Sequence, residues 1–421
     1  MTPAWWAVVA LGSLGIGLAV AALTLVPWRV PGPTREARAA ALRDIPDDVV
    51  ARGRALHAAL RPSVYGSMTA GLAVILLLGL TPAGARIVAG MGRPFHEHWL
   101  AEAVLGGLAL LFILWSVSLP FAVWRHIVLR RYGLSTQDWG GWSLEMLKGV
   151  AVAVVTASGA LAGFYTLTRL APSWWWAFAA VAAATLTIVL TFVVPVLVEP
   201  LFNTFTPMPD GPLHEELVTM AARDGIRLRH VLVADASRRT RGLNAYVSGF
   251  GATRRLVVYD TLLRQATPGE VRSVVAHELG HTKERDPEVG ALMGAIGSAA
   301  AVIALYLLGQ WDALLSRAGV DSIAEPTALG MVLAVLAVGG LVSGPVQNLF
   351  SRRVEARADQ HALRLTGDPA EFVSMEQRLA EVNLADVQPP RIEYLLFATH
   401  PDTVERIAAA RESERGPDHA S

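Results

Sequence analysis

Residues 277–281 read His-Glu-Leu-Gly-His, which brings two metal-binding side chains and a carboxylate into five residues. On a helix, His277 and His281 project from one face, so both imidazoles can bind one tetrahedral metal ion. Glu278 lies beside them and can take a proton from a metal-activated water and pass it to a leaving amine. The pattern therefore predicts zinc-dependent hydrolysis of a peptide bond, although so short a pattern also arises by chance in ordinary helices.

The residues around this pattern favour the catalytic interpretation. An apolar run from Val271 to Ala276 provides a helical lead-in, and Pro268–Glu270 is typical of a helix start. Gly280 lacks a side chain and leaves room for a peptide or another stretch of backbone to approach closely.

A catalytic zinc ion needs a third protein ligand, and this chain contains no cysteine to provide it. The nearest carboxylates along the chain are Glu284, Asp286 and Glu288. Glu284 would have to reach back along the same helix, and the neighbouring Lys283 and Arg285 are typical of a solvated helix end. We therefore expect the third ligand to come from elsewhere in the sequence.

The segment Ser351–Asp359 offers a better third ligand. Glu355 and Asp359 are four residues apart, so one helix face would carry both carboxylates. Glu355 could bind the metal, while Asp359 could accept the free ring N–H of a ligating histidine and orient it. The alternative is a salt-bridged helix face formed with Arg352, Arg353 and Arg357. We prefer the metal ligand, because the site otherwise lacks one.

Composition indicates a membrane protein. The chain has 421 residues, of which 53% are hydrophobic and 17% charged, and its mean hydropathy is +0.41. These values are too apolar for a soluble enzyme of this length. Lys plus Arg and Asp plus Glu are balanced at 36 each, so nothing indicates a nucleic-acid partner.

Seven apolar stretches are long enough to cross a hydrocarbon core of about 30 Å. They span residues 4–28, 65–85, 99–124, 147–168, 174–197, 289–311 and 326–347. The first has no basic residue before Arg29 and no convincing cleavage site, so we interpret it as a retained anchor.

The distribution of basic residues predicts an orientation. Arginines crowd the segment after the first span, and the loop after the third span is also basic, whereas the loops at 169–173 and 312–325 carry few basic residues. Basic loops remain in the cytoplasm, which places the N-terminus outside and the catalytic region and C-terminus inside. High Ala, Gly and Arg usage with short loops is typical of a bacterial protein, so we expect a plasma-membrane location.

We predict a mainly α polytopic membrane protein with about seven transmembrane helices and a small α+β zincin-like subdomain. Residues 1–199 would form five spans, 200–288 the metalloprotease subdomain, 289–347 a two-span hairpin, and 348–421 a helical part that completes the zinc site. Within the subdomain, short strands are predicted at 230–235, 244–248 and 255–259.

One of these strands is a candidate for substrate binding. If Asn244, Ala245 and Tyr246 form the edge of a sheet, an extended peptide can add to it and present its carbonyl to the metal. An ordinary structural hairpin strand fits the same pattern.

The seven spans, the His-Glu-Leu-Gly-His pattern between the fifth and sixth, and Glu-Ala-Arg-Ala-Asp after the seventh together resemble a known family. The chain is similar to the CAAX prenyl protease 1 class of integral-membrane zinc metallopeptidases, the gluzincins of peptidase family M48. Further matching segments include Leu119–Phe121, Arg131–Leu134, Glu199–Phe202, Ser237–Thr240, Tyr259–Leu263 and Phe397–Pro401.

The resemblance implies one Zn²⁺ per chain, bound by His277, His281 and Glu355, with Glu278 as general base. It also implies that Asp359 contacts a metal ligand and does not bind the metal itself. It also suggests that His400 and Arg406 lie near the site, where a donor or cation could stabilise the tetrahedral oxyanion. Taken alone, His400 before a proline would more often be a loop residue or a helix cap.

The defining substrates of this class are prenylated C-terminal CAAX peptides, so the resemblance implies a peptide or protein substrate, membrane-associated or lipidated, processed at the lipid bilayer. Two alternatives remain. One is a quality-control protease like the heat-shock membrane peptidase HtpX, which shares the metal motif but has fewer spans. The other is a catalytically idle membrane scaffold, transporter or chaperone, for which Glu278 would have no use.

Overall fold

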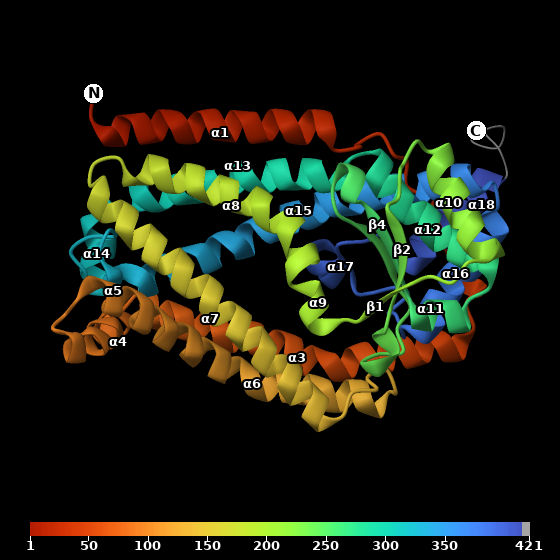
Figure 1. The fold of residues 1–421 in the computed structure, drawn as a ribbon, viewed down its shortest axis with the longest axis horizontal. Helices are drawn as coiled ribbons and strands as arrows, with labels where there is room; N and C mark the ends of the chain where they lie inside the picture. The colour runs from red at the N-terminus through yellow and green to blue at the C-terminus, as the bar shows by residue number, and fades with distance from the viewer. Residues whose placement is uncertain (415–421) are drawn as a thin grey trace.

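Long helices dominate the structure, a computed structural model that describes residues 1–414 (Figure 1). Within this range, seven helical stretches are long and apolar enough to cross a membrane, as predicted. They are α1 (Pro3–Leu25), α3 (Asp47–Gly79), α5 to α6 (Trp99–Arg131, through a π-helical turn at Glu102–Gly106), α7 (Trp139–Leu170), α8 to α9 (Trp175–Leu197 and Glu199–Phe202), α13 (Asp286–Leu308) and α15 (Leu329–Thr366).

Several of these helices extend well beyond the predicted spans. Helix α15 has 38 residues and α3 has 33, which corresponds to lengths of about 57 and 50 Å at ~1.5 Å per residue. Both lengths exceed a hydrocarbon core of about 30 Å, so the extra turns continue into the polar part of the protein. The span predicted at 65–85 ends earlier, at Gly79, because Thr81 caps a new helix, α4 (Pro82–Gly92).

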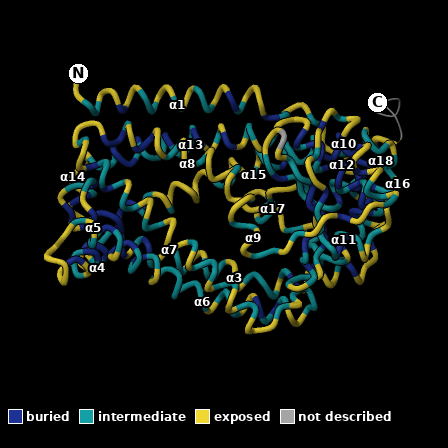
Figure 2. The backbone as a smooth tube through the Cα atoms, viewed as in Figure 1, coloured by how far each residue is buried: buried dark blue, intermediate teal, exposed yellow. Residues whose placement is uncertain are grey.

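The surface of the long helices fits a lipid environment. Large apolar side chains remain exposed along α1 and α8, including Ile16, Leu23 and Val181. Figure 2 marks exposed positions along both helices. Small polar side chains also link neighbouring helices: the hydroxyl of Thr187 on α8 donates a hydrogen bond to the hydroxyl of Ser298 on α13 at 3.0 Å. Helix α4, the short α5 and α14 (Asp312–Ala318) gather at the end of the bundle away from the sheet (Figure 1).

A four-stranded mixed sheet lies at the other end of the molecule (Figure 1). Its order is β1-β2-β4-β3, where β1 is Phe205–Pro207, β2 His230–Ala234, β4 Arg255–Tyr259 and β3 Ala245–Ser248. Strands β2 and β4 are parallel, and the two outer pairs are antiparallel. The three predicted strands are present to within one residue, and β3 lies at an edge.

Short helices enclose this sheet and share its apolar core, which includes Leu217, Leu256, Val275 and Phe372. They are α10 (Pro212–Arg223), α11 (Asp260–Gln265), α12 (Pro268–Lys283), α16 (Pro369–Val382) and α18 (Thr403–Glu414). Helix α2 (Arg35–Arg43) packs against α18, and α17 (Arg391–Phe397) packs against α15. The expected domain borders at 288/289 and 347/348 fall inside α13 and α15. Membrane and catalytic parts are therefore joined by unbroken helices.

Candidate metal centre

The helix that carries the His-Glu-Leu-Gly-His pattern has a strongly fixed start. The Thr267 hydroxyl accepts the backbone N–H of Glu270 at 3.2 Å, and the Glu270 carboxylate accepts the N–H of Thr267 at 2.8 Å. Glu270 is fully buried and also accepts Arg378 Nε at 2.6 Å. Burial alone would raise the pKa of Glu270, but these hydrogen bonds outweigh it and lower the pKa. An ionised carboxylate thus anchors α12 to α16.

Gly280 allows α12 and α15 to cross closely. A Cβ atom at this position would lie 3.1 Å from the Cβ of His361 and 3.3 Å from the Cα of Ala358. The space predicted at Gly280 is therefore taken by the His361 side chain and the Ala358 backbone of α15, and not by a peptide. This close approach brings Glu355 to the two histidines of α12.

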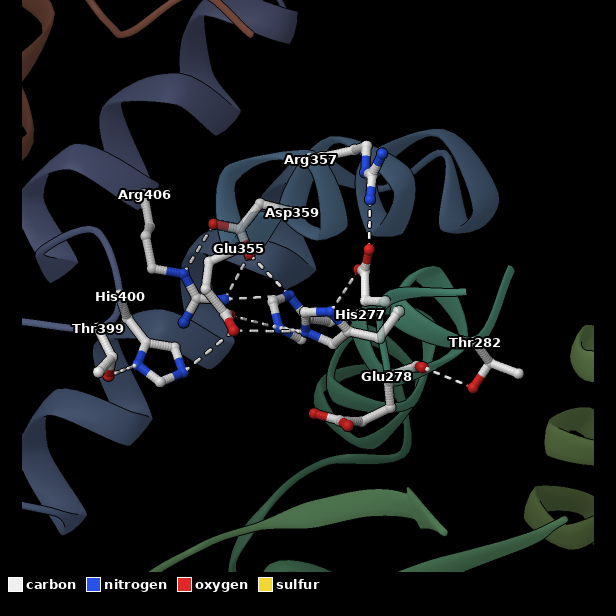
Figure 3. Close-up of polar contacts among 11 residues, drawn as sticks. His277, Glu278, Thr282, Glu355, Arg357, Asp359, Thr399, His400 and Arg406 are labelled. Atoms are coloured by element: carbon white, nitrogen blue, oxygen red, sulfur yellow. Dashed lines mark hydrogen bonds and ion pairs between the residues drawn. The ribbon is translucent and has the colours of Figure 1, made fainter. Parts of the chain in front are cut away.

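Three donor atoms converge where these helices cross (Figure 3). The Nε2 atoms of His277 and His281 are 3.2 Å apart, and the Glu355 carboxylate lies 3.2 Å from His277 Nε2 and 3.6 Å from His281 Nε2. Zinc bonds of about 2.0–2.1 Å place tetrahedral ligands about 3.3 Å apart. Glu355 Oε2 is the carboxylate oxygen that faces His277 Nε2. The spacing of the three donor atoms fits a bound cation.

Each histidine is oriented by a carboxylate behind it. Asp359 lies 2.8 Å from Nδ1 of His277, and Asp286 lies 2.9 Å from Nδ1 of His281. Such contacts leave Nε2 of each ring free for a metal. Burial by itself would lower both imidazole pKa values, but the hydrogen bonds to Asp359, Asp286 and Glu355 raise the pKa of His277 to about 9 and of His281 to about 10. The surroundings therefore favour positive charge at this point.

Sequence reasoning placed Asp359 in this arrangement but did not assign Asp286 to it. The signal for Asp286 was its position five residues after His281, at the start of the next helix, where Arg357 also binds it. Glu284, the weaker ligand candidate, instead lies 3.4 Å from Arg357. The structure thus brings Glu355 to the histidines and leaves Glu284 outside the cluster.

Glu278 faces a small cavity beside the cluster. The cavity has a volume of ≈ 140 Å³, and His277, Asn244 and His400 also line it. No polar contact joins the Glu278 carboxylate to the histidines or to Glu355 in Figure 3. Burial raises the pKa of Glu278, while the neighbouring histidines act in the opposite direction. A carboxylate with a raised pKa is suited to accepting and returning a proton near neutral pH.

His400 and Arg406 both reach this site but occupy different surroundings. The His400 side chain is 59% exposed, and its Nε2 lies 3.4 Å from Glu355. Arg406 is bound by Asp359 through two nitrogens, with the Nε contact at 2.9 Å, and by Glu376 at 2.8 Å. Both residues line the cavity, but the Arg406 guanidinium is already engaged by two carboxylates.

Glu376 is a further residue that sequence reasoning missed. It is 4% exposed on α16, and burial raises its pKa to about 7 although Arg406 opposes that effect. Nothing in the sequence around Glu376 distinguishes it from a solvent-facing glutamate on an amphipathic helix. Only the packing of α16 against α18 shows that it holds Arg406, and through Arg406 the Asp359 carboxylate.

The candidate substrate strand lies next to the same cavity. Asn244 lines the cavity, and Ala245 and Tyr246 begin β3 at the sheet edge. The carbonyl of Asn244 accepts the N–H of Tyr259 on β4 at 3.0 Å. Since successive amide groups along a strand alternate in direction, the N–H of Ala245 points to the open side of β3. This backbone donor is therefore directed toward the edge of the sheet, at a residue that is only 1% exposed.

Helices that span a membrane and a buried His-His-Glu cluster with an adjacent carboxylate define a multi-pass membrane metalloprotease. Sequence comparison supports this class. Residues 207–414 match the model of peptidase family M48, and residues 63–204 match that of the CAAX prenyl protease N-terminal region of five membrane helices.

Individual relatives agree with these matches. The chain is 30% identical over 315 residues to the CAAX prenyl protease 1 homolog of Arabidopsis thaliana, covering 72% of each chain. It is 27% identical over 343 residues to the uncharacterized metalloprotease YhfN of Bacillus subtilis, covering 79% of this chain and 80% of the relative. The crystal structure of S. mikatae Ste24p has the same fold, with a TM-score of 0.78 at 20% identity, covering 96% of this chain and 99% of that one.

The chain belongs to peptidase family M48, as a CAAX prenyl protease homologue with an N-terminal membrane domain. It is a multi-pass integral membrane protein and a metalloprotease that hydrolyses peptide bonds. The match to the CAAX prenyl protease N-terminal region favours this type over an HtpX-like protease, and the family assignment argues against an idle scaffold.

Proposed function

We propose that the chain is a zinc-dependent membrane endopeptidase in which His277, His281 and Glu355 hold the metal and Glu278 is the general base. The observation that carries this proposal is the convergence of three donor atoms, all within 4.8 Å of one another, beside a cavity that Glu278 lines. When bound, zinc supplies a Lewis acid that polarises the peptide carbonyl and acidifies water.

The side chains around the cavity then have distinct tasks. Glu278 takes a proton from the attacking water and delivers it to the leaving nitrogen. His400, whose ring borders the cavity, donates to the oxyanion that forms on the former carbonyl oxygen. Arg406 acts through Asp359, because its nitrogens are bound to that carboxylate and to Glu376. Asp359 and Asp286 keep the imidazoles in the orientation that presents Nε2.

Zinc-dependent hydrolysis is the direct test of this function. Purified protein in detergent should hydrolyse a peptide, lose activity after treatment with a chelator, and regain it when about one equivalent of Zn²⁺ is restored. Peptide cleavage is measured by mass spectrometry and metal content by atomic absorption. Activity that persists in fully metal-free protein would exclude the mechanism.

We further propose that the peptide binds as an added strand along β3, through the edge-directed N–H of Ala245 and its neighbours Asn244 and Tyr246. The names of relatives in the CAAX prenyl protease group support a peptide that is membrane-associated or lipidated. Backbone hydrogen bonds at an edge give affinity with little demand on side-chain type.

Replacement of Ala245 by proline should weaken this binding. Proline removes the N–H that faces the open edge, while the Asn244 carbonyl can still accept from Tyr259. We expect a rise in KM of about tenfold or more for loss of such a hydrogen bond and its geometry, with zinc content unchanged. Ala245→Ser, which keeps the N–H, serves as the matched control. Unchanged kinetics in the proline variant would rule out strand addition here.

The proposed orientation places the metal centre on the cytoplasmic side. Both basic segments contact the catalytic part: Arg38 pairs with Asp402 at 2.9 Å, and the N–H of Thr136 donates to the carbonyl of Arg239 at 3.1 Å. The weakly basic loops lie at the opposite end of the bundle (Figure 1). Both observations agree with the rule that basic loops stay inside.

Reporter fusions can check this orientation. Fusions after Ala40, Tyr132 and Gly211 should report the cytoplasm, and a fusion at Ser322 should report the outside. An external signal at Gly211 would reverse the proposed orientation.

A further inference from the structure

Two adjoining cavities lie beside helix α17. Their volumes are ≈ 670 and ≈ 660 Å³, both within the range of about 300–1,000 Å³ that is usual for ligand pockets. Tyr394 and Leu395 of α17 line both, so the two cavities share a wall. We call the first the apolar cavity and the second the arginine cavity. Neither is lined by a proposed metal ligand or by Glu278.

The apolar cavity lies at the level where two long helices leave the membrane. Val30 and Leu349 line it, and each follows a predicted membrane span by two residues. The rings of Trp28 and Phe350 meet edge to face at 5.6 Å, and the Trp28 ring N–H donates to the carbonyl of Ala22 at 2.8 Å. Tryptophan is enriched at membrane–water interfaces because its ring is amphipathic. This cavity is therefore at the height of the membrane surface on the catalytic side.

The lining of the apolar cavity suits a hydrocarbon chain. Its charged groups are already hydrogen-bonded within the protein: Glu405 accepts the Tyr394 hydroxyl at 2.7 Å, and Glu412 accepts the backbone N–H of Thr34 at 3.0 Å. A ligand there meets little unsatisfied polarity, and apolar groups gain by leaving water. The apolar side chains that line the cavity include Val30, Pro31, Leu349, Leu363 and Leu395.

The arginine cavity has the opposite character. Three arginines line it, Arg35 and Arg38 from α2 and Arg391 from α17, but only one carboxylate, that of Asp402. Arg38 pairs with Asp402 at 2.9 Å. Arg35 and Arg391 are exposed, and neither forms an ion pair with a residue in the described range 1–414. An anionic group would complement these two charges.

We propose that an anionic phospholipid from the leaflet on the catalytic side binds in the two cavities. Exposed arginines alone are ordinarily hydrated, but here they adjoin an apolar cavity at the membrane surface. A phospholipid has the matching structure, with an acyl chain for the apolar cavity and a phosphate for Arg35 and Arg391. The planar guanidinium group pairs with phosphate through two parallel hydrogen bonds.

Such a lipid would contact segments that are far apart in the chain. Helix α2 has nine residues, α17 has seven, and both pack against longer helices rather than against each other. A ligand that binds only the folded arrangement stabilises it in proportion to its affinity and concentration. We therefore expect bound phospholipid to raise the Tm of the protein.

Three ligands separate the headgroup, the chain and the free anion. Protein in a neutral detergent is titrated with phosphatidylglycerol, with phosphatidylcholine of the same chains, and with glycerol phosphate. Binding is followed by thermal unfolding and by native mass spectrometry. We expect phosphatidylglycerol to bind at least about tenfold more tightly than phosphatidylcholine and to raise the Tm, as for a charged hydrogen bond. Glycerol phosphate should give no shift at the same concentrations.

The double variant Arg35→Gln with Arg391→Gln should weaken phosphatidylglycerol binding by about 30-fold, since each arginine near an anionic surface contributes about fivefold. The matched control is Arg52→Gln with Arg54→Gln, which removes two exposed arginines of α3 that line neither cavity. That control should keep the full affinity. Both double variants should retain zinc-dependent peptide cleavage in detergent, because none of these arginines belongs to the metal centre or lines its cavity.

The acyl chain has its own pair of variants on α17. Leu395 is 48% exposed and lines both cavities, so Leu395→Gln should weaken phosphatidylglycerol binding by about tenfold. Ile392 is 72% exposed on the same helix but lines neither cavity, and Ile392→Gln should leave the affinity unchanged. Both side chains are exposed enough for glutamine to be tolerated in the fold.

Several results would overturn the assignment. Equal binding of the two phospholipids by the wild-type protein excludes a site for an anionic headgroup. An equal loss of affinity in both double arginine variants would leave only a general attraction between a basic surface and anionic lipid. Binding of glycerol phosphate as tight as that of phosphatidylglycerol would assign the arginine cavity to a soluble anion, and unchanged affinity in Leu395→Gln would exclude the chain from the apolar cavity.

Discussion

Replacement of Glu278 by glutamine should reduce peptide hydrolysis by about 10²–10⁴-fold or more while zinc stays bound. Glutamine has nearly the same size but accepts no proton near neutral pH. Glu278 lines the catalytic cavity without belonging to the three-donor cluster, so its loss should not disturb metal binding. The measurements are single-turnover peptide cleavage and zinc content of the same purified sample.

The matched control for this prediction is Glu284→Gln. Glu284 is a glutamate three residues after His281, but it contacts Arg357 and not the three-donor cluster. We expect near-normal cleavage in that variant. A Glu278→Gln protein with nearly wild-type turnover would remove Glu278 from the mechanism, and loss of zinc in it would assign Glu278 to the metal instead.

Removal of any one metal donor should reduce peptide hydrolysis about as much as Glu278→Gln does, but here the cause is loss of the metal itself. His277→Ala, His281→Ala and Glu355→Ala each leave two of three ligands, and we expect zinc to fall from about one per chain to near zero after dialysis. Asp359→Asn should act more mildly, weakening zinc affinity by about 10–100-fold, because it changes the partner of His277 Nδ1 and of Arg406 but removes no metal donor. Competition with a fluorescent chelator measures both effects.

Glu284→Ala serves as the control for ligand identity, since it removes a carboxylate close to His281 in sequence but outside the cluster. Stoichiometric zinc after Glu355→Ala, together with loss after Glu284→Ala, would contradict the proposed third ligand. Helix content from circular dichroism must stay unchanged in each variant, because α12 and α15 cross at this point and misfolding would also release metal.

Much of this site was predictable from local sequence, for a physical reason. A helix repeats every 3.6 residues, so His277 with His281 and Glu355 with Asp359 necessarily share faces. The number of membrane spans was predictable as well, because a lipid core imposes a minimum apolar length on any crossing helix. Strands β2, β3 and β4 were found from short runs of β-favouring residues between turns.

What the sequence did not specify was the contact between distant segments. The crossing of α12 and α15 depends on Gly280 packing against Ala358, and only that packing selects Glu355 over the nearer Glu284. The role of Glu376 likewise comes from Arg406, 30 residues further along the chain, and Asp286 is held beside His281 by Arg357 of the distant helix α15. Their sequence surroundings resemble those of ordinary solvated carboxylates.

Helix ends show the same division. Hydropathy located the apolar centre of each span but not its limits, because the turns that extend α3 and α15 are stabilised by packing against the catalytic part rather than by lipid. The cavity that α6, α7 and residues 239–244 line had no sequence signal at all, since these segments lie about 100 residues apart in the chain. Local periodicity therefore determined which residues share a face, and tertiary packing decided which faces meet.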